Sequence, residues 1–233
     1  MAPAQILDRH AAFGFAQEAD DLLFGKTLLH VQSPWGRELD SKLRCYSKLG
    51  GRRTCDDSLE GIRDRALLCF GFSSGGRRRS EVAAADMRDL RKTGDGGYIY
   101  RLEHSKTQQA GATSDSTPDK PIVGRSAEAL AAWLAAANIT QGPLFRRLWK
   151  DRVGPALLPG SIATIVKRHA AMAGLEGDFG GHSLRSGFVT EAGKQGVPLP
   201  AVMAMTEHRS VATVLGYFQA GAAEDNPAAR LLK

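Results

Sequence analysis

The sequence has few cysteines and no long apolar run. Cys45, Cys55 and Cys69 are odd in number, and no two of them are spaced as C-x-x-C. This pattern argues against a disulfide framework and against a zinc site. No segment approaches the roughly 20 apolar residues of a membrane span, and the N-terminus lacks a basic start followed by an apolar core. We therefore expect a soluble protein of the reducing cytoplasm.

The sequence does contain enough apolar material for a core, and it has an excess of basic charge. Hydrophobic residues make up 42% of the 233 positions, which predicts one principal domain with at most a small appendage. Lys and Arg total 31 against 25 acidic residues, a net charge of +6. This balance favours a polyanionic partner without identifying one, since a soluble protein with no such partner can be equally basic.

Regular structure is predicted only after the first part of the chain. Residues 1–57 show apolar clusters without a sustained period, and the basic stretch 37–53 suits either a linker along a phosphate backbone or a solvated loop. From Ser58, a plausible N-cap, apolar residues recur at helical spacing until Gly75 and Gly76. A helix followed by a second short helix over 79–85 is therefore expected.

The middle of the chain predicts a small sheet, and the rest predicts helices. Two extended runs flank Gly-Asp-Gly-Gly at 94–97 as in a β-hairpin, Pro121–Val123 is a third candidate strand, and 105–118 is typical of a loop. Five Ala-rich segments with apolar spacing of three or four follow, at 127–138, 161–174, 182–196, 198–207 and 210–221. The predicted fold is mainly α with a small three-stranded antiparallel β-sheet.

Several residues suit phosphate chemistry, although each has an ordinary structural explanation. His182 and Arg185 are spaced i, i+3 near the start of a predicted helix, and Arg78 follows a glycine pair at another helix start. Lys106 opens a loop beyond a strand. His208 and Tyr217 lie nine residues apart, so they share a face only if the backbone bends between them. Structural pairs, solvated charges and a core tyrosine are the alternatives.

Taken together, these residues carry a family resemblance. GGRRRSE, HSKTQQAG, HSLRSG and EHRSVATVLGY occur in the order Arg, Lys, His-x-x-Arg, His, Tyr, and the stretch 58–220 resembles the catalytic domain of the tyrosine recombinases, the phage integrase family. The R-x-S-E pattern assigns the first arginine to Arg78. The implied catalytic residues are Arg78, Lys106, His182, Arg185, His208 and Tyr217.

The resemblance implies a site-specific recombinase that cleaves and rejoins double-stranded DNA through a 3′-phosphotyrosine at Tyr217. Arg78 and Arg185 would hold the non-bridging phosphate oxygens, so neither a metal nor another cofactor nor ATP is implied. Lys106 would protonate the leaving 5′-oxygen, His182 would assist proton transfer and His208 would donate to the phosphate. The family acts as a tetramer on DNA, so a homo-oligomer there and a monomer free in solution are expected.

The sequence departs from the family pattern at both ends of this domain. Glu207 replaces the glycine that usually precedes the last histidine, and it would be strained if that position needs a positive φ. Residues 1–57 are shorter and less regular than a core-binding domain, so we expect a remnant or a linker there and weak, unspecific DNA binding. The tail 221–233 is expected to dock on a neighbouring subunit or on its own chain.

Three other functions fit parts of the sequence. Gly71–Gly75 satisfies the G-x-S-x-G pattern of serine hydrolases, with Ser73 as the nucleophile, but the segment is more typical of a helix end. A type IB topoisomerase would use a similar set of residues. A non-catalytic or truncated DNA-binding remnant would keep the basic residues and lose the chemistry.

Overall fold

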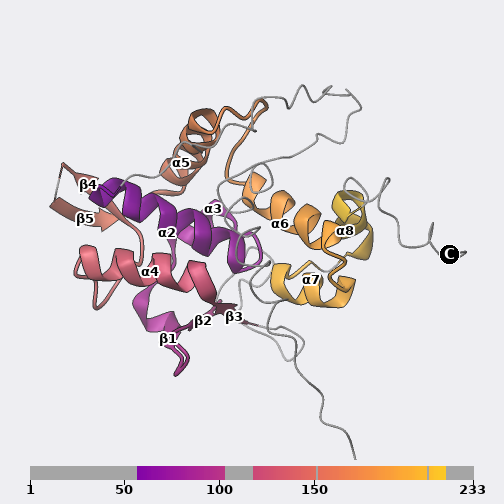
Figure 1. The fold of residues 1–233 in the computed structure, drawn as a ribbon, viewed down its shortest axis with the longest axis horizontal. Coiled ribbons are helices and arrows are strands. Elements are labelled where there is room, and N and C mark those ends of the chain that lie inside the picture. Colours follow the sequence, from indigo (N-terminus) through magenta and orange to yellow (C-terminus); the bar gives the residue numbers. More distant parts are fainter. Residues whose placement is uncertain (1–56, 103–117, 151, 209, 219–233) are drawn as a thin grey trace, which may run out of the picture.

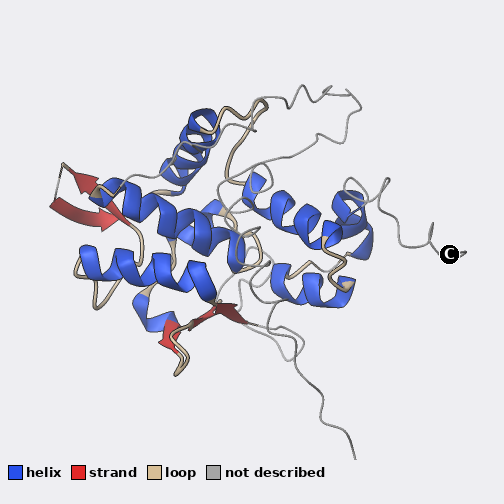
Figure 2. Ribbon diagram, in the orientation of Figure 1, coloured by secondary structure: helices blue, strands red, loops and turns tan. Residues whose placement is uncertain are grey.

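The structure is a computed structural model that describes residues 57–102, 118–150, 152–208 and 210–218. Helices predominate, and the strands form small antiparallel sheets (Figure 2). The predicted fold class is therefore confirmed. Within these ranges, no helix has both the length and the apolar character that crossing a membrane requires.

Helix α2 (Leu59–Ser73) begins and ends where the sequence predicts. The Ser58 hydroxyl oxygen accepts a hydrogen bond from the amide of Gly61 at 3.1 Å, which satisfies one of the amides left without an intrahelical partner. The helix stops before Gly75 and Gly76, which take φ values of +96° and +67°. The short helix α3 (Arg79–Ala83) follows at once.

The predicted three-stranded sheet is present, in the order β1-β2-β3. Strand β2 (Tyr98–Arg101) lies between β1 (Leu90–Lys92) and β3 (Asp119–Ile122), and both pairings are antiparallel. The third strand starts two residues before the predicted Pro121. A single 3-10 turn, Met87–Asp89, leads into the sheet.

A second sheet was not predicted from the sequence. Strands β4 (Arg146–Trp149) and β5 (Arg152–Ala156) form an antiparallel hairpin. The usual hairpin signal is missing because Lys150, rather than Gly or Asn, takes the positive φ of +55° near the turn. Gly and Pro inside β5 also weaken the strand pattern.

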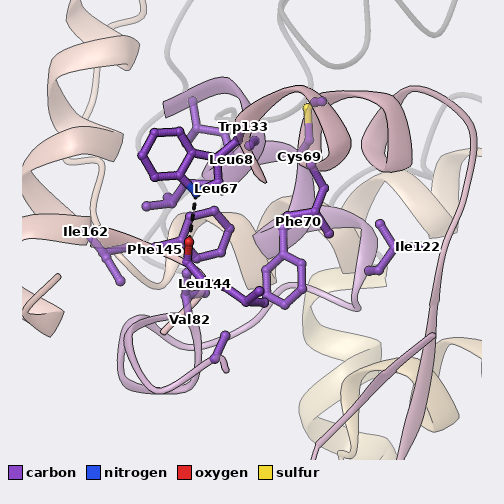
Figure 3. Packing of buried hydrophobic residues seen from close by; sticks show 14 of the residues in the cluster. Leu67, Leu68, Cys69, Phe70, Val82, Ile122, Trp133, Leu144, Phe145 and Ile162 are labelled. Atoms are coloured by element: carbon purple, nitrogen blue, oxygen red, sulfur yellow. Dashed lines mark hydrogen bonds between the residues drawn. The ribbon is translucent and has the colours of Figure 1, made fainter. Parts of the chain in front are cut away.

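The main core lies between α2 and α4 (Gly124–Ala136), which run side by side in Figure 1. Phe70 of α2 packs edge-on against Tyr100 at 5.0 Å and Phe145 at 5.4 Å between ring centroids. Figure 3 shows buried Trp133 of α4, whose indole N–H donates to the Leu144 carbonyl at 2.8 Å. Helix α4 is thereby fixed to the chain that follows it.

The remaining helices are α5 (Pro159–Met172), α6 (Ser183–Lys194), α7 (Leu199–Thr206) and α8 (Val211–Phe218). Helix α5 packs near α3, whereas α6, α7 and α8 form a separate group (Figure 1). That group has a small core of its own, made of Val189, Ala192, Val202 and Val214. Since α6 also packs on α2, the two groups meet at the C-terminal end of α2.

Candidate functional site

Two glycines after α2 let the chain pass very close to α6 and to the end of α7. A Cβ atom on Gly75 would lie 2.2 Å from the carbonyl oxygen of Met205, and one on Gly76 would lie 2.3 Å from the Cα of Arg185. Both positions also need a positive φ, which glycine adopts without steric cost. This turn therefore brings the arginines that follow it to α6 and α7.

Of the first two arginines, Arg77 and Arg78, the second has the more accessible guanidinium. Its side chain is 28% exposed, and its Nη1 lies 2.8 Å from Oε1 of Glu81. Arg77 is buried: its Nη2 donates to the Met205 carbonyl at 2.5 Å, and its Nη1 lies 3.7 Å from Glu81. Arg77 therefore holds two segments together, and Arg78 can reach a ligand.

Arg185 lies in the first turn of α6 and is buried among backbone carbonyls. Its Nη2 donates to the carbonyl of Thr206, its Nη1 lies 3.5 Å from that of Gly76, and its Nε donates to Nε2 of His208 at 3.3 Å. Burial, reinforced by Arg78 and Arg77, lowers the pKa of the guanidinium to about 10. The side chain remains cationic at neutral pH.

The hydrogen bonds around His208 define a neutral tautomer. The Thr206 hydroxyl donates to the Val202 carbonyl at 2.8 Å, so its oxygen accepts from Nδ1 of His208, also at 2.8 Å. The other ring nitrogen, Nε2, then accepts from Arg185. This assignment follows from satisfying each donor in turn, and it places the imidazole proton on Nδ1.

The electrostatic environment of the two histidines indicates an anion site. Burial, followed by the charges of Arg185 and Arg78, lowers the pKa of His182, which is the N-cap of α6. The same causes, with smaller contributions from His182 and Arg77, lower the pKa of His208 to about 4. Cationic groups from separate segments thus repel one another, and a bound anion would relieve that repulsion.

The turn between α7 and α8 has the backbone geometry that the sequence suggested. Glu207 is the C-cap of α7 and has a φ of +56° and a ψ of +37°, the left-handed conformation that glycine prefers. The condition under which the sequence analysis expected strain at Glu207, a positive φ, is therefore met. His208 follows Glu207 and precedes helix α8, which starts at Val211, so His208 and Tyr217 do not share one continuous helix.

Two of the six predicted site residues cannot be placed in full. Lys106 lies outside the described residues. Tyr217 belongs to helix α8, but its side chain lies outside the described part of the structure. Arg185 and His208 are in direct contact, with Nε and Nε2 3.3 Å apart. Arg78 and His182 lie in the same region, since the charges of Arg78 and Arg185 lower the pKa of both histidines.

Three further residues, none of them among the predicted site residues, support this site. Glu81 pairs with both arginines after the glycine turn, Thr206 orients His208, and Lys120 of β3 lies 3.2 Å from the carboxylate of Glu207. Glu81 was visible in the R-x-S-E pattern. Nothing in the sequence marks Lys120, since it lies in a short strand far from the other positions.

The serine hydrolase alternative is contradicted by the structure. Ser73 is the last residue of α2 rather than the apex of a turn after a strand, and the preceding residues of the motif are helical.

In the described ranges, no group of three or more His, Cys, Asp or Glu side chains has an arrangement that would hold a metal ion.

Curated proteins with similar sequences are recombinases. The chain is 36% identical over 171 residues to the "Integrase/recombinase xerD homolog" of Selenomonas ruminantium, an alignment covering 71% of this chain and 50% of that protein. It is 32% identical over 167 residues to "Tyrosine recombinase XerC" of Ralstonia pickettii (strain 12J), covering 69% and 50%. The chain spans about half the length of the curated relatives it matches.

Solved structures of recombinases share the fold. The crystal structure of XerA recombinase matches with a TM-score of 0.53 at 17% identity, covering 72% of this chain and 55% of that one. The post-cleavage complex of XerH site-specific recombinase bound to palindromic difH substrate matches with a TM-score of 0.56 at 20% identity, covering 76% and 47%. The sequence pattern described as the phage integrase family matches residues 53–224. The chain therefore belongs to the phage integrase family, the tyrosine recombinases.

Proposed function

We propose that this chain is a DNA strand transferase that cleaves and rejoins DNA through a covalent 3′-phosphotyrosine at Tyr217. The observation that carries the proposal is the meeting of Arg78, His182, Arg185 and His208, which come from three segments of the chain. The repulsion between the two arginines, whose charges also disfavour protonation of the histidines, is a cost that a phosphodiester would remove. A site preorganised in this way stabilises negative charge developing on phosphorus.

In the reaction, the two arginines bind the non-bridging oxygens of the scissile phosphate. Arg185 is held by the carbonyls of Thr206 and Gly76, so little conformational entropy is lost when it meets the phosphate. The Arg78 side chain is more exposed, and it binds the phosphate from the side of α3. Guanidinium groups supply paired hydrogen-bond donors and fixed positive charge. That charge neutralises the phosphate as a divalent cation does in many nucleases.

The Tyr217 oxygen attacks phosphorus, and the bond to the 5′-oxygen breaks. The phenol proton is lost to a base, for which His182 is the candidate, and the leaving 5′-oxygen takes a proton from Lys106. Reversal of these steps by a 5′-hydroxyl restores the phosphodiester, so the bond energy is conserved and ATP is not consumed. His208 contributes by donating a hydrogen bond from Nε2 to a phosphate oxygen once that nitrogen has gained a proton.

The partner in this proposal is double-stranded DNA. The net charge of +6 supports a polyanionic ligand, and the similar XerH was solved with its difH substrate. We propose that residues 58–220 are the catalytic unit, a stretch that lies within the matched region 53–224. Association of several copies on DNA belongs to the same proposal, because exchanging two strands between two duplexes needs more than one nucleophile.

A nicked duplex tests the proposal. A nick placed beside the scissile phosphate lets the short leaving strand diffuse away, so the protein–DNA adduct accumulates and survives denaturation. We expect an adduct on DNA that flanks the gene, and we expect Tyr217→Phe to abolish it. The matched control is Tyr98→Phe on strand β2, which should leave adduct formation within about twofold.

The outcomes separate the proposal from its alternatives. An adduct that persists in Tyr217→Phe would show that another residue is the nucleophile. Salt-sensitive binding with no adduct on any flanking sequence would identify a DNA-binding remnant instead.

A further inference from the structure

The C-terminal end of α7 is held by three cations from three different elements. Lys120 of β3 donates to the carbonyl of Ala204 at 2.7 Å, Arg77 donates to that of Met205 at 2.5 Å, and Arg185 donates to that of Thr206. The last carbonyls of a helix lack intrahelical partners and carry partial negative charge. The position of this helix end, and of His208 just beyond it, therefore depends on these contacts.

Lys120 makes a second contact at the same point. Its side chain is fully buried, and its Nζ lies 3.2 Å from Oε1 of Glu207, whose side chain is 9% exposed. Within the described ranges, neither oxygen of that carboxylate accepts a hydrogen bond of good geometry. Burial lowers the pKa of the Lys120 ammonium, and the charge of Glu207 opposes that shift. The lysine is therefore the close counterion of a buried carboxylate.

The backbone conformation of Glu207 links its ion pair with Lys120 to the positions of Thr206 and His208. A non-glycine residue at φ +56° is strained, and its side chain must leave the backbone in a fixed direction. Here that direction leads toward β3, away from open solvent. Because Thr206 and His208 are its neighbours, any shift of Glu207 moves the carbonyl that binds Arg185 and the ring that contacts it.

We propose that Lys120 and Glu207 are a positioning pair that fixes the left-handed end of α7 and thereby the contact between Arg185 and His208. Lys120 also neutralises a carboxylate that would otherwise repel the phosphate. The consequence for catalysis rests on the proposed function, whereas the consequence for His208 does not. The two residues are expected to be interdependent, so that a glycine at 207 makes the lysine dispensable.

The experiment is a double-substitution cycle in which the first quantity measured is the pKa of His208. Imidazole signals are followed by NMR during a pH titration of the wild type, Lys120→Met, Glu207→Gly and Lys120→Met/Glu207→Gly. Lys120→Met should release the Arg185–His208 contact and raise the pKa of His208 by at least about one unit toward its ordinary value. The double variant should return the pKa to the wild-type value. Lys92→Met, on exposed strand β1 of the same sheet, is the matched control.

Adduct formation on the nicked duplex is the second measurement. Lys120→Met should reduce the rate by about tenfold or more, and the double variant should recover to within about threefold of Glu207→Gly. If Lys120→Met does not fold, the comparison within the Glu207→Gly background decides, because the lysine should be dispensable there.

Each outcome bears on a separate claim. The positioning pair is refuted if Lys120→Met leaves the His208 titration unchanged, or if Lys120→Met damages the Glu207→Gly protein as severely as the wild type. If the wild type forms no adduct but the titrations behave as expected, the pair stands and the proposed function fails.

Discussion

At the scale of single residues, His208 is the group whose chemistry depends most on its neighbours. Its Nε2 accepts from Arg185, so this nitrogen cannot donate to a phosphate until it gains a proton. Burial and the charges of Arg185 and Arg78 oppose that proton and hold the pKa at about 4. The role proposed for His208 therefore requires the phosphate itself to raise this pKa.

A bound phosphate should raise the pKa of His208 by at least about one unit, since the anion offsets the surrounding positive charge. The complex then binds more protons than the free protein at pH values above about 4. Affinity for a short duplex should consequently increase as the pH falls from neutrality toward about 5. NMR titration with and without inorganic phosphate measures the pKa, and a binding titration at several pH values measures the linkage.

His169 provides an internal control for this titration. It is buried on α5, with Nε2 2.8 Å from a carboxylate oxygen of Asp64, and it belongs to a cluster that joins α5 to α2. Its signals should not respond to phosphate. An anion that leaves the His208 signals unchanged as well would exclude His208 from the binding site.

At the scale of elements, the site depends on how closely the end of α2 approaches α6. The pair Gly75 and Gly76 meets the backbone of Met205 and Arg185 directly, so even one methyl group has no space. The contact also explains why Arg77 and Arg78 reach residues more than 100 positions further along the chain. The packing of the end of α2 against α6 therefore also brings the site residues together.

Gly76→Ala should separate these elements. The added Cβ would lie 2.3 Å from the Cα of Arg185, which side-chain rearrangement cannot relieve. We expect the free energy of unfolding to fall by about 3 kcal/mol or more, because the position becomes both overpacked and strained. Phosphate and DNA binding should be lost with it. Urea denaturation and a DNA-binding titration measure the two effects.

Gly96→Ala is the matched control for this substitution. Gly96 also has a positive φ, +85°, but a Cβ there would meet no atom within 4 Å. Only the conformational strain applies, which costs about 1 kcal/mol. Equal destabilisation by the two substitutions would show that the close approach of α2 to α6 is unimportant.

At the scale of the whole molecule, the excess of basic charge should govern binding to DNA. The logarithm of the binding constant should fall linearly with the logarithm of salt concentration, with a slope of about −0.9 for each phosphate neutralised. Arg78→Gln should reduce the magnitude of that slope by about one, because one phosphate contact is lost. Fluorescence anisotropy with a labelled duplex at several salt concentrations measures it.

Arg88→Gln is the corresponding control, because Arg88 is exposed on the 3-10 turn before the sheet and lies near Asp86 and Asp89. Its loss should leave the slope nearly unchanged. A slope that is equally insensitive to Arg78 would place that arginine outside the phosphate contact.

The sequence by itself determined most of the local structure and supplied the prediction of the site residues. Ser58 and the glycine pair set the limits of α2, and apolar spacing predicted the later helices, because caps and periodicity are local properties. The order of the motifs, through the resemblance to the tyrosine recombinases, predicted six catalytic residues, and the structure places Arg78, His182, Arg185 and His208 in one region. The catalytic roles of these four residues stay predictions, as do those of Lys106 and Tyr217.

Only the tertiary structure decided which groups act on one another. It distinguished accessible Arg78 from buried Arg77, although both stand in the same run of arginines. It also paired Lys120 with Glu207 and formed the β4–β5 hairpin without the usual turn residues. Burial, long-range ion pairs and close backbone contacts join positions that are far apart in the chain. No local pattern encodes them, because their energies exist only once the helices have packed.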